Sequence, residues 1–332
     1  MRSRNILIIK LGALGDVVLS LPQIMKLLEV HADDHVTLLT APAFAELVDG
    51  LPLQVVTFRR KGFVEMLRIV RWLLWQQFDV VYDLQGSLRS RVMTQLTQAD
   101  KRVGRKPAIA YTHAPPDQGA GSHAFDCFNE VLVAGGLEAA LPWLQLPVSV
   151  AATMRVADWL QQQGLTDKKL VLLHAGSSRQ WLSKRWPEAC FRSLADALEA
   201  RGLVVVWTGG ADERTLNAHL ATHAGVDATT VFGLAELLAL AGRAVFAVTN
   251  DSGPMHVLSA AALPVYAFFG PTDWRRSHAL GQAEHVLFNK VSCSPCQLPI
   301  CPPEREHACM QGITPEAVLA RLEADGLLPL QG

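Results

Sequence analysis

An acidic residue closes a glycine-containing motif near the N-terminus, where the apolar segment NILIIK leads into KLGALGD. Asp16 lies at the start of the helix expected next, and Gly12 permits a tight turn and close approach of the backbone to a ligand. A carboxylate in this position can act as a general base, or it can simply cap the helix. The motif is not GxGxxG, so the fingerprint of dinucleotide-binding proteins is absent here.

A second motif, HAGSSRQWLSKRWP at residues 174–187, stands between a predicted strand and a predicted helix. The hydroxyl groups of Ser177 and Ser178 and the ammonium group of Lys184 suit an anionic ligand, since the N-terminus of a helix also favours negative charge. A solvated basic loop is the alternative interpretation.

Two further motifs join a predicted strand to a helix. In TGGADE, Gly209 lets the backbone approach a ligand, and either Asp212 or Glu213 could accept a hydrogen bond from a ribose hydroxyl or complement the helix dipole. The motif TNDSGPMH provides a second pocket for a phosphate or sugar group, formed by Asp251, Ser252, the N–H of Gly253 and His256.

The elements that position these motifs alternate between short apolar segments and amphipathic segments. We predict strands at residues 5–10, 36–40, 54–58, 80–84, 170–174, 204–208, 230–232, 245–249 and 265–269. We predict helices at residues 16–30, 63–78, 87–97, 123–134, 187–201, 212–223, 236–243 and 315–325. This alternation is typical of parallel sheets with helices on both faces, in which ligands bind beyond the carboxyl ends of the strands.

The alternation pauses between residues 108 and 150 and then starts again, which predicts two domains, residues 1–150 and 151–332. A length of 332 residues agrees with two domains. The fold class is therefore α/β, with two doubly wound Rossmann-like domains and a cleft between them.

The composition excludes several classes of protein. With 50% hydrophobic residues the chain can build a large core, which excludes disorder, and a net charge of −1 argues against a nucleic-acid partner. The apolar residues 6–9 are too few for a signal peptide. Residues 252–272 carry no charge but are divided by glycine and proline, which favours a short helix and a buried strand over a membrane span. We expect a soluble cytoplasmic protein.

Taken together, these motifs resemble those of the bacterial lipopolysaccharide heptosyltransferases, glycosyltransferase family 9. The matching segments are IIKLGALGDVVLSLP, HAGSS…KRWPE, TGGADE, TNDSGPMHVLSA, FGPTD and CSPC…C…CMQGITPEAV, which occur in family order over nearly the whole chain. The resemblance implies a GT-B fold, whose first domain binds the acceptor and whose second domain binds the donor. It also implies inverting transfer of heptose from ADP-heptose to the inner core of lipopolysaccharide.

The resemblance also implies roles for individual residues. Asp16 matches the catalytic aspartate of the family, which would act as the base that takes the proton of the acceptor hydroxyl, and Lys184 matches the donor-binding lysine. Ser177, Ser178, Asp251, Gly253 and His256 match donor-pocket positions, and either Asp212 or Glu213 matches the acidic position near the ribose. Because cations and helix N-termini would stabilise the departing ADP, we expect neither a catalytic metal nor a cofactor.

A basic segment in the first domain suits the anionic lipopolysaccharide core and lipid A acceptor. Residues 59–106 contain 11 Lys and Arg against 4 Asp and Glu, a net charge of +7, and they include Arg59, Arg60, Lys61 and Arg89. The alternative is a set of solvated helix faces. The helix expected at residues 63–78 could also contact the cytoplasmic face of the inner membrane, although its tryptophans are more typical of a core.

Four of the 6 cysteines form a cluster, Cys293, Cys296, Cys301 and Cys309. Four thiolates could hold a structural zinc, but the spacing does not match a standard finger, and we favour free thiols in a compact loop.

Three other functions remain open at this point. They are transfer from another nucleotide sugar, nonenzymatic binding of a sugar nucleotide, and nicotinamide-dependent oxidoreduction, which the missing GxGxxG disfavours.

Overall fold

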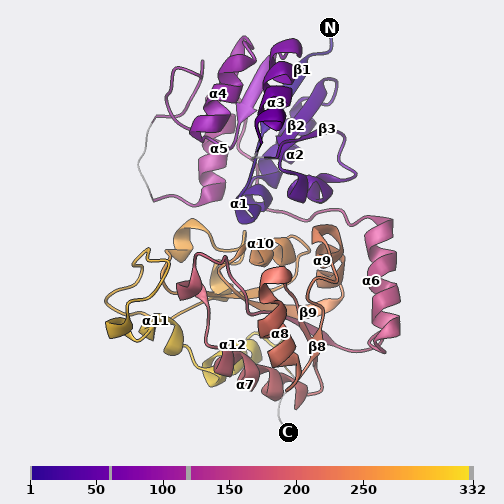
Figure 1. Cartoon of the computed structure of the whole chain (residues 1–332), viewed down its shortest axis with the longest axis vertical. Coiled ribbons are helices and arrows are strands. Elements are labelled where there is room, and N and C mark those ends of the chain that lie inside the picture. The colour runs from indigo at the N-terminus through magenta and orange to yellow at the C-terminus, as the bar shows by residue number, and fades with distance from the viewer. Residues whose placement is uncertain (1, 60–61, 117–120, 329–332) are drawn as a thin grey trace. The chain divides into compact units, whose positions relative to one another are not determined.

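The computed structural model describes residues 2–59, 62–116 and 121–328. The chain forms two compact units, Met1–Leu144 and Gln145–Gly332, called unit 1 and unit 2 below (Figure 1). The division falls shortly before residue 150, where the sequence analysis places a domain boundary.

Unit 1 is built on a five-stranded parallel sheet with the order β3-β2-β1-β4-β5. The strands are β1 (Asn5–Ile9), β2 (His35–Thr40), β3 (Gln54–Thr57), β4 (Val80–Asp83) and β5 (Lys101–Val103). The strand order reverses between β1 and β4, which is the position where doubly wound sheets bind ligands.

Helices cover both faces of this sheet because both faces of each central strand are apolar. Alternate residues of a strand point to opposite faces, so Leu7 and Ile9 of β1 pack in one cluster with α3 and α4, while Ile6 and Ile8 are buried outside that cluster. The helices are α1 (Leu14–Leu19), α2 (Leu21–Val30), α3 (Phe63–Trp75), α4 (Leu88–Leu96) and α5 (Ala124–Ala134), with the 3₁₀ helix η1 (Pro42–Val48).

Unit 2 contains a six-stranded parallel sheet with the order β11-β10-β9-β6-β7-β8. The strands are β6 (Leu170–His174), β7 (Val204–Trp207), β8 (Val226–Asp227), β9 (Ala244–Asn250), β10 (Val265–Phe269) and β11 (Val286–Phe288). Here the order reverses between β6 and β9, so this sheet repeats the topology of unit 1 with one more strand.

The helices of unit 2 enclose a core that contains Trp186, Phe191 and Phe268, whose rings stack or meet edge to face. They are α6 (Val150–Gln162), α7 (Glu188–Glu199), α8 (Arg214–Ala221), α9 (Leu234–Ala241), α10 (Gly253–Ser259), α11 (Ala308–Gln311) and α12 (Pro315–Ala324). Short 3₁₀ helices are η2 (Leu182–Lys184), η3 (Ala211–Glu213), η4 (Trp274–Arg276), η5 (Ala283–His285) and η6 (Pro303–Arg305). Figure 1 shows α6 beside α9, against which it packs.

The predicted fold class is confirmed. The strands β5 and β11 and the helices α6 and α11 were not predicted, and two of the predicted elements differ in the structure. The single helix expected at residues 16–30 is two helices, because Pro22 lacks an N–H and its ring would clash with the carbonyl of Val18 in a continuous helix. The strand expected at residues 230–232 is wrong: Thr230 has a φ of 63°, and the strand is β8 instead.

Residues 252–272 contain the short helix α10 and the buried strand β10, as the sequence predicts. In the part of the chain that the structure describes, no helix combines the length and apolar composition needed to span a membrane.

Candidate functional site

The candidate base of unit 1 lies in the first turn of α1. The Asp16 side chain is 46% exposed, and its Oδ2 atom lies 3.9 Å from Nζ of Lys10. The turn before the helix depends on Gly12, whose φ of 128° is rarely open to other residues. The carboxylate is therefore accessible to a substrate and has a positive charge beside it.

Lys10 is a residue of this site that the sequence analysis did not select. It is fully buried, its Nζ lies 4.2 Å from the centre of the Phe128 ring, and it donates a 3.5 Å hydrogen bond to the carbonyl of Leu84. A lysine at the end of the apolar segment NILIIK was a signal for it, because a buried ammonium group needs partners.

The site of unit 2 is formed by four loops at one edge of the sheet. β10, β9, β6 and β7 are neighbouring parallel strands, so the loops that follow them lie together. Asn250 connects the two central loops, because its Nδ2 donates to the carbonyls of Ala175 and Gly176 at 2.9 and 3.0 Å. Its Oδ1 accepts from the backbone N–H of Trp186 at 2.8 Å.

An ion pair between a partly exposed lysine and a buried carboxylate lies at this edge. Nζ of Lys184 is 2.7 Å from Oδ2 of Asp251, and the hydroxyl of Thr272 donates to the same oxygen at 2.7 Å. The three residues come from the loops after β6, β9 and β10. The sequence analysis selected Lys184 and Asp251 but not Thr272, although Thr272 belongs to the quoted segment FGPTD.

The two predicted serines are in different environments. The buried hydroxyl of Ser177 donates to the carbonyl of Trp181 at 2.9 Å and accepts from Nε of Arg185 at 3.1 Å. Ser178 is exposed. The first hydroxyl therefore holds the loop together, whereas the second is accessible to a ligand.

Glu213 and Asp212 also differ in their environments. Glu213 is buried, and its carboxylate accepts from the backbone N–H of Gly210 at 2.9 Å, whereas Asp212 is paired with Arg179. A Cβ atom on Gly176 would lie 2.4 Å from Cγ of Glu213, and one on Gly209 would lie 2.8 Å from its Cβ. Both glycines are required by the close packing of the loops after β6 and β7.

Asp251 leads into the N-terminus of α10, where the remaining candidates lie. Gly253 is the first residue of the helix, and His256 is buried within it. The buried hydroxyl of Ser252 has no hydrogen-bond partner among the described residues. Since a buried polar group without a partner is costly, this hydroxyl is available to a ligand.

His174, at the end of β6, is fully buried, and burial lowers the pKa of its imidazole; the carboxylate of Glu213 opposes this shift. Its Nδ1 donates to the carbonyl of Thr208 at 2.9 Å. We conclude that the imidazole is neutral and links the loops after β6 and β7.

The segment of residues 293–309, called the cysteine loop, forms hydrogen bonds to residues adjacent to the ion pair of Lys184 and Asp251. The carbonyls of Leu298 and Pro299 accept from the hydroxyl and the N–H of Ser183, at 2.6 and 3.1 Å. On its other side, Ser294 donates to the carbonyl of Gly270 at 2.6 Å. The loop thereby holds the neighbours of both Lys184 and Thr272.

The four cysteines of this loop are free. Burial, followed by the neighbouring thiols of Cys293, Cys301 and Cys296, raises the pKa of the Cys309 thiol to about 11. Within the described residues, no group of three or more His, Cys, Asp or Glu side chains is arranged to hold a metal ion. Cys309 packs against Gly270, where an added Cβ would lie 2.8 Å from its Sγ.

Two of the predicted acceptor cations, Arg59 and Arg89, are described and exposed. The guanidinium of Arg89, on α4, lies 5.9 Å from the centre of the ring of Phe58, the residue that precedes Arg59 in the chain. Arg60 and Lys61 lie outside the described residues. Other cations of the basic segment have structural contacts: Lys101 donates to the carbonyl of Gly135 at 2.6 Å.

Two Rossmann-like units in one chain are the architecture of the GT-B class of glycosyltransferases. Residues 66–305 match the family described as glycosyltransferase family 9 (heptosyltransferase), and the chain belongs to this family. It is therefore an enzyme that transfers glycosyl groups of the heptosyl type, which excludes the nonenzymatic and oxidoreductase alternatives.

Known proteins resemble the chain over almost its full length. Lipopolysaccharide heptosyltransferase 1 of Pseudomonas aeruginosa is 29% identical, covering 98% of this chain and 99% of the relative. A family 9 glycosyltransferase from Veillonella parvula superposes with a TM-score of 0.83 at 22% identity, over 97% and 96% of the two chains. The ADP-heptose LPS heptosyltransferase II of E. coli has a TM-score of 0.76 at 20% identity, over 96% and 98%.

Proposed function

We propose that the protein transfers heptose from ADP-heptose to the inner core of lipopolysaccharide, with inversion at the anomeric carbon. The names of the relatives support this donor and this acceptor, since they include a lipopolysaccharide heptosyltransferase and an ADP-heptose LPS heptosyltransferase. In this proposal unit 2 binds the donor, unit 1 binds the acceptor, and the reaction takes place on the cytoplasmic side of the inner membrane.

Unit 2 supplies the groups that bind the donor pyrophosphate. Lys184 is already held within 2.7 Å of Asp251, so its ammonium group is positioned before a ligand arrives. The exposed hydroxyl of Ser178, in the same loop as Lys184, and the hydroxyl of Ser252 and the N–H of Gly253, which follow Asp251, are further hydrogen-bond donors. Donors that are fixed in advance stabilise a departing diphosphate without costly reorganisation.

Asp16 is the general base of the proposed reaction. Its accessible carboxylate takes the proton of the acceptor hydroxyl while that oxygen attacks the anomeric carbon and the bond to ADP breaks. Asp16 is neutral once it holds the proton, and the negative charge that its carboxylate loses appears on ADP, where Lys184 and the hydroxyls offset it. A single displacement of this kind inverts the anomeric configuration and needs one base.

The acceptor in this proposal is the anionic lipid core, bound by unit 1. The net charge of +7 over residues 59–106 attracts phosphorylated sugars, and exposed Arg59 and Arg89 are its described candidates.

The observation that carries the proposal is the ion pair of Lys184 with the buried carboxylate of Asp251, to which Thr272 also donates, at the point where the strand order of unit 2 reverses. The direct test is a panel of donors, ADP-heptose, ADP-glucose and UDP-glucose, assayed with truncated lipopolysaccharide acceptors. We expect turnover with ADP-heptose and a product of inverted configuration. Preference for another donor, or retention of configuration, would contradict the proposal.

A further inference from the structure

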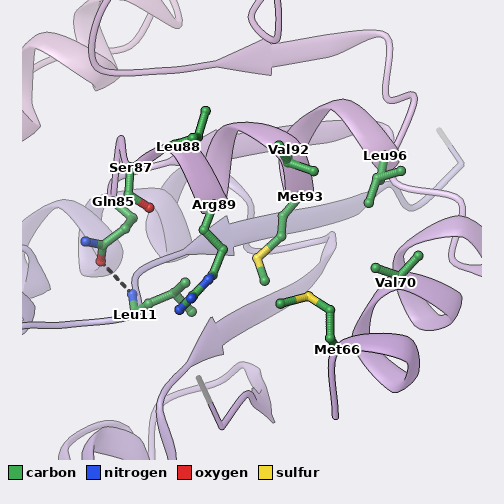
Figure 2. Close-up of a pocket in the computed structure, with 10 residues that line it drawn as sticks. All are labelled: Leu11, Met66, Val70, Gln85, Ser87, Leu88, Arg89, Val92, Met93 and Leu96. Carbon is green, nitrogen blue, oxygen red and sulfur yellow. Dashed lines mark hydrogen bonds between the residues drawn. The ribbon is translucent and has the colours of Figure 1, made fainter. Parts of the chain in front are cut away.

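A cavity of about 620 Å³ lies in unit 1 between α3 and α4 (Figure 2). This volume is within the range of small-molecule sites. Its lining is mostly apolar, with Met66 and Val70 from α3 and Val92, Met93 and Leu96 from α4. Figure 2 shows Met66 and Met93 extending toward one another, and such flexible thioethers adapt to apolar ligands.

The cavity has a polar end and an apolar end. Gln85, Ser87 and Arg89 lie at the start of α4, whereas Leu96 ends that helix and lies near Val70 at the opposite end of the cavity in Figure 2. At 1.5 Å per residue, the helix spans about 12 Å between these ends. A ligand that fits this lining has a polar head and an apolar chain.

The polar end is connected to the turn that carries Asp16. Leu11 lines the cavity, and its backbone N–H donates to Oε1 of Gln85 at 2.9 Å. Leu11 follows β1 and Gln85 follows β4, so the cavity opens where the strand order of unit 1 reverses. A chain bound here has its head group directed toward the catalytic turn.

The surface around the cavity has the character of a lipid-binding surface. Leu88 and Val92 on α4 are 79% and 53% exposed, although both line the cavity. The helices α3 and α4 carry four arginines and a single acidic residue, Glu65, which is paired with Arg68. Apolar side chains next to excess positive charge complement a lipid with an anionic head.

We propose that this cavity binds an acyl chain of the acceptor lipid, with the anionic head of that lipid at Arg89. The inference rests on the proposed function for the identity of the lipid. Binding of the chain places the acceptor on unit 1 through apolar contacts, and the cations then orient its head group.

The first test measures binding without turnover. Inorganic phosphate and alkyl phosphates of four to ten carbons, below their micellar concentrations, are titrated into the full-length protein by calorimetry. We expect affinity to rise about fourfold for each added methylene until the cavity is full, because each buried CH₂ contributes about 0.8 kcal/mol. Affinity that does not depend on chain length would overturn the proposal.

Variants locate the binding. Val92→Glu places a charge at the rim and should weaken decyl phosphate at least tenfold, whereas Val133→Glu, at a similarly exposed valine on α5, should change nothing. Arg89→Gln should weaken decyl phosphate but not decyl maltoside, which has no charge. Both valines are exposed, so melting temperatures should stay close to wild type; equal weakening by the two glutamates would overturn the assignment.

The second test identifies the source of the chain. In Val92→Glu the KM for the acylated acceptor should rise at least fivefold, while kcat and the KM for a deacylated acceptor stay the same. An equal rise for both acceptors, or loss of binding to phospholipid vesicles with an unchanged acceptor KM, would overturn the proposal. If the wild type transfers no heptose but still binds alkyl phosphates by chain length, the proposed function fails and the cavity remains a lipid site.

Discussion

The two units place different chemistry at the same topological position. In unit 1 the strand order reverses between β1 and β4, and the loops there carry a half-exposed Asp16 and border an apolar cavity. In unit 2 it reverses between β6 and β9, and the loops there carry the ion pair of Lys184 with the buried carboxylate of Asp251. The shared topology determines where a ligand can bind, whereas the loop side chains determine which ligand it is.

The two sites also differ in how firmly their charges are held. Nζ of Lys184 lies 2.7 Å from Oδ2 of Asp251, and the hydroxyl of Thr272 donates to the same oxygen, whereas Oδ2 of Asp16 lies 3.9 Å from Nζ of Lys10. A firmly held cation suits ground-state binding of a diphosphate. An accessible carboxylate suits proton transfer to and from a substrate.

The largest effect should come from Asp16→Asn, which removes the base and leaves the fold of unit 1 intact. Loss of general-base catalysis should lower kcat by about 10²- to 10⁴-fold, with little change in donor affinity. The measurement is steady-state kinetics with ADP-heptose. Asp126→Asn is the matched control, because Asp126 occupies the first turn of α5 and loses the same helix-dipole interaction. Equal turnover in the two variants would show that Asp16 only stabilises its helix.

The next effect concerns unit 2. Lys184→Ala should weaken ADP binding by about tenfold to a hundredfold, since a hydrogen bond to a charged group contributes about 1.5–3 kcal/mol. Calorimetric titration with ADP measures it, and Lys168→Ala, at an exposed lysine of the same unit, should bind ADP like the wild type. If acceptor KM changes instead of ADP affinity, the division of roles between the units is wrong.

A smaller effect is expected on the free energy of unfolding when Lys184 is replaced. Lys184→Ala leaves the buried carboxylate of Asp251 with one partner fewer, and we expect a loss of about 1–3 kcal/mol in the free energy of unfolding. The double variant Lys184→Ala/Asp251→Asn should recover part of this loss, because no uncompensated charge remains. Denaturant unfolding of the wild type, Lys184→Ala, Asp251→Asn and the double variant measures the coupling free energy between the two residues, and strict additivity would mean that the pair is not a stabilising contact.

The smallest effect should be a pH dependence from His174. Burial lowers the pKa of the folded imidazole below its usual value of 6.5, so the unfolded chain binds the proton more readily. Stability is therefore fully present above pH 6.5 and falls as the pH drops below it, by at most about 1.4 kcal/mol per pH unit.

Calorimetry of His174→Gln at pH 5.5 and 7.5 tests this expectation. The variant should lose less stability on acidification than the wild type. His35→Gln, at an exposed histidine of unit 1, should keep the dependence of the wild type. An unchanged dependence in His174→Gln would assign the titration to another group.

The hydrophobic pattern of the sequence predicted the strands with long apolar runs well, and it predicted strands with few apolar residues poorly. β1, β6 and β10 follow from apolar runs that both faces of a buried sheet require. β5 is only KRV and has no such run, so its place at the sheet edge depends on pairing with β4. Thr230 was placed in a strand from its neighbours, but its left-handed backbone belongs to a turn.

The sequence alone determined the two sheets, the loops that follow their strands and the chemical character of those loops, because hydrophobic period and glycine positions are local properties. Only the tertiary structure decided that Lys184 meets Asp251 and Thr272, that Glu213 requires Gly176, and that the cysteine loop supports both. It also decided that α3 and α4 leave a cavity beside the turn of Asp16. These contacts join residues far apart in the chain, and their partners are set by strand order and packing, which no local pattern encodes.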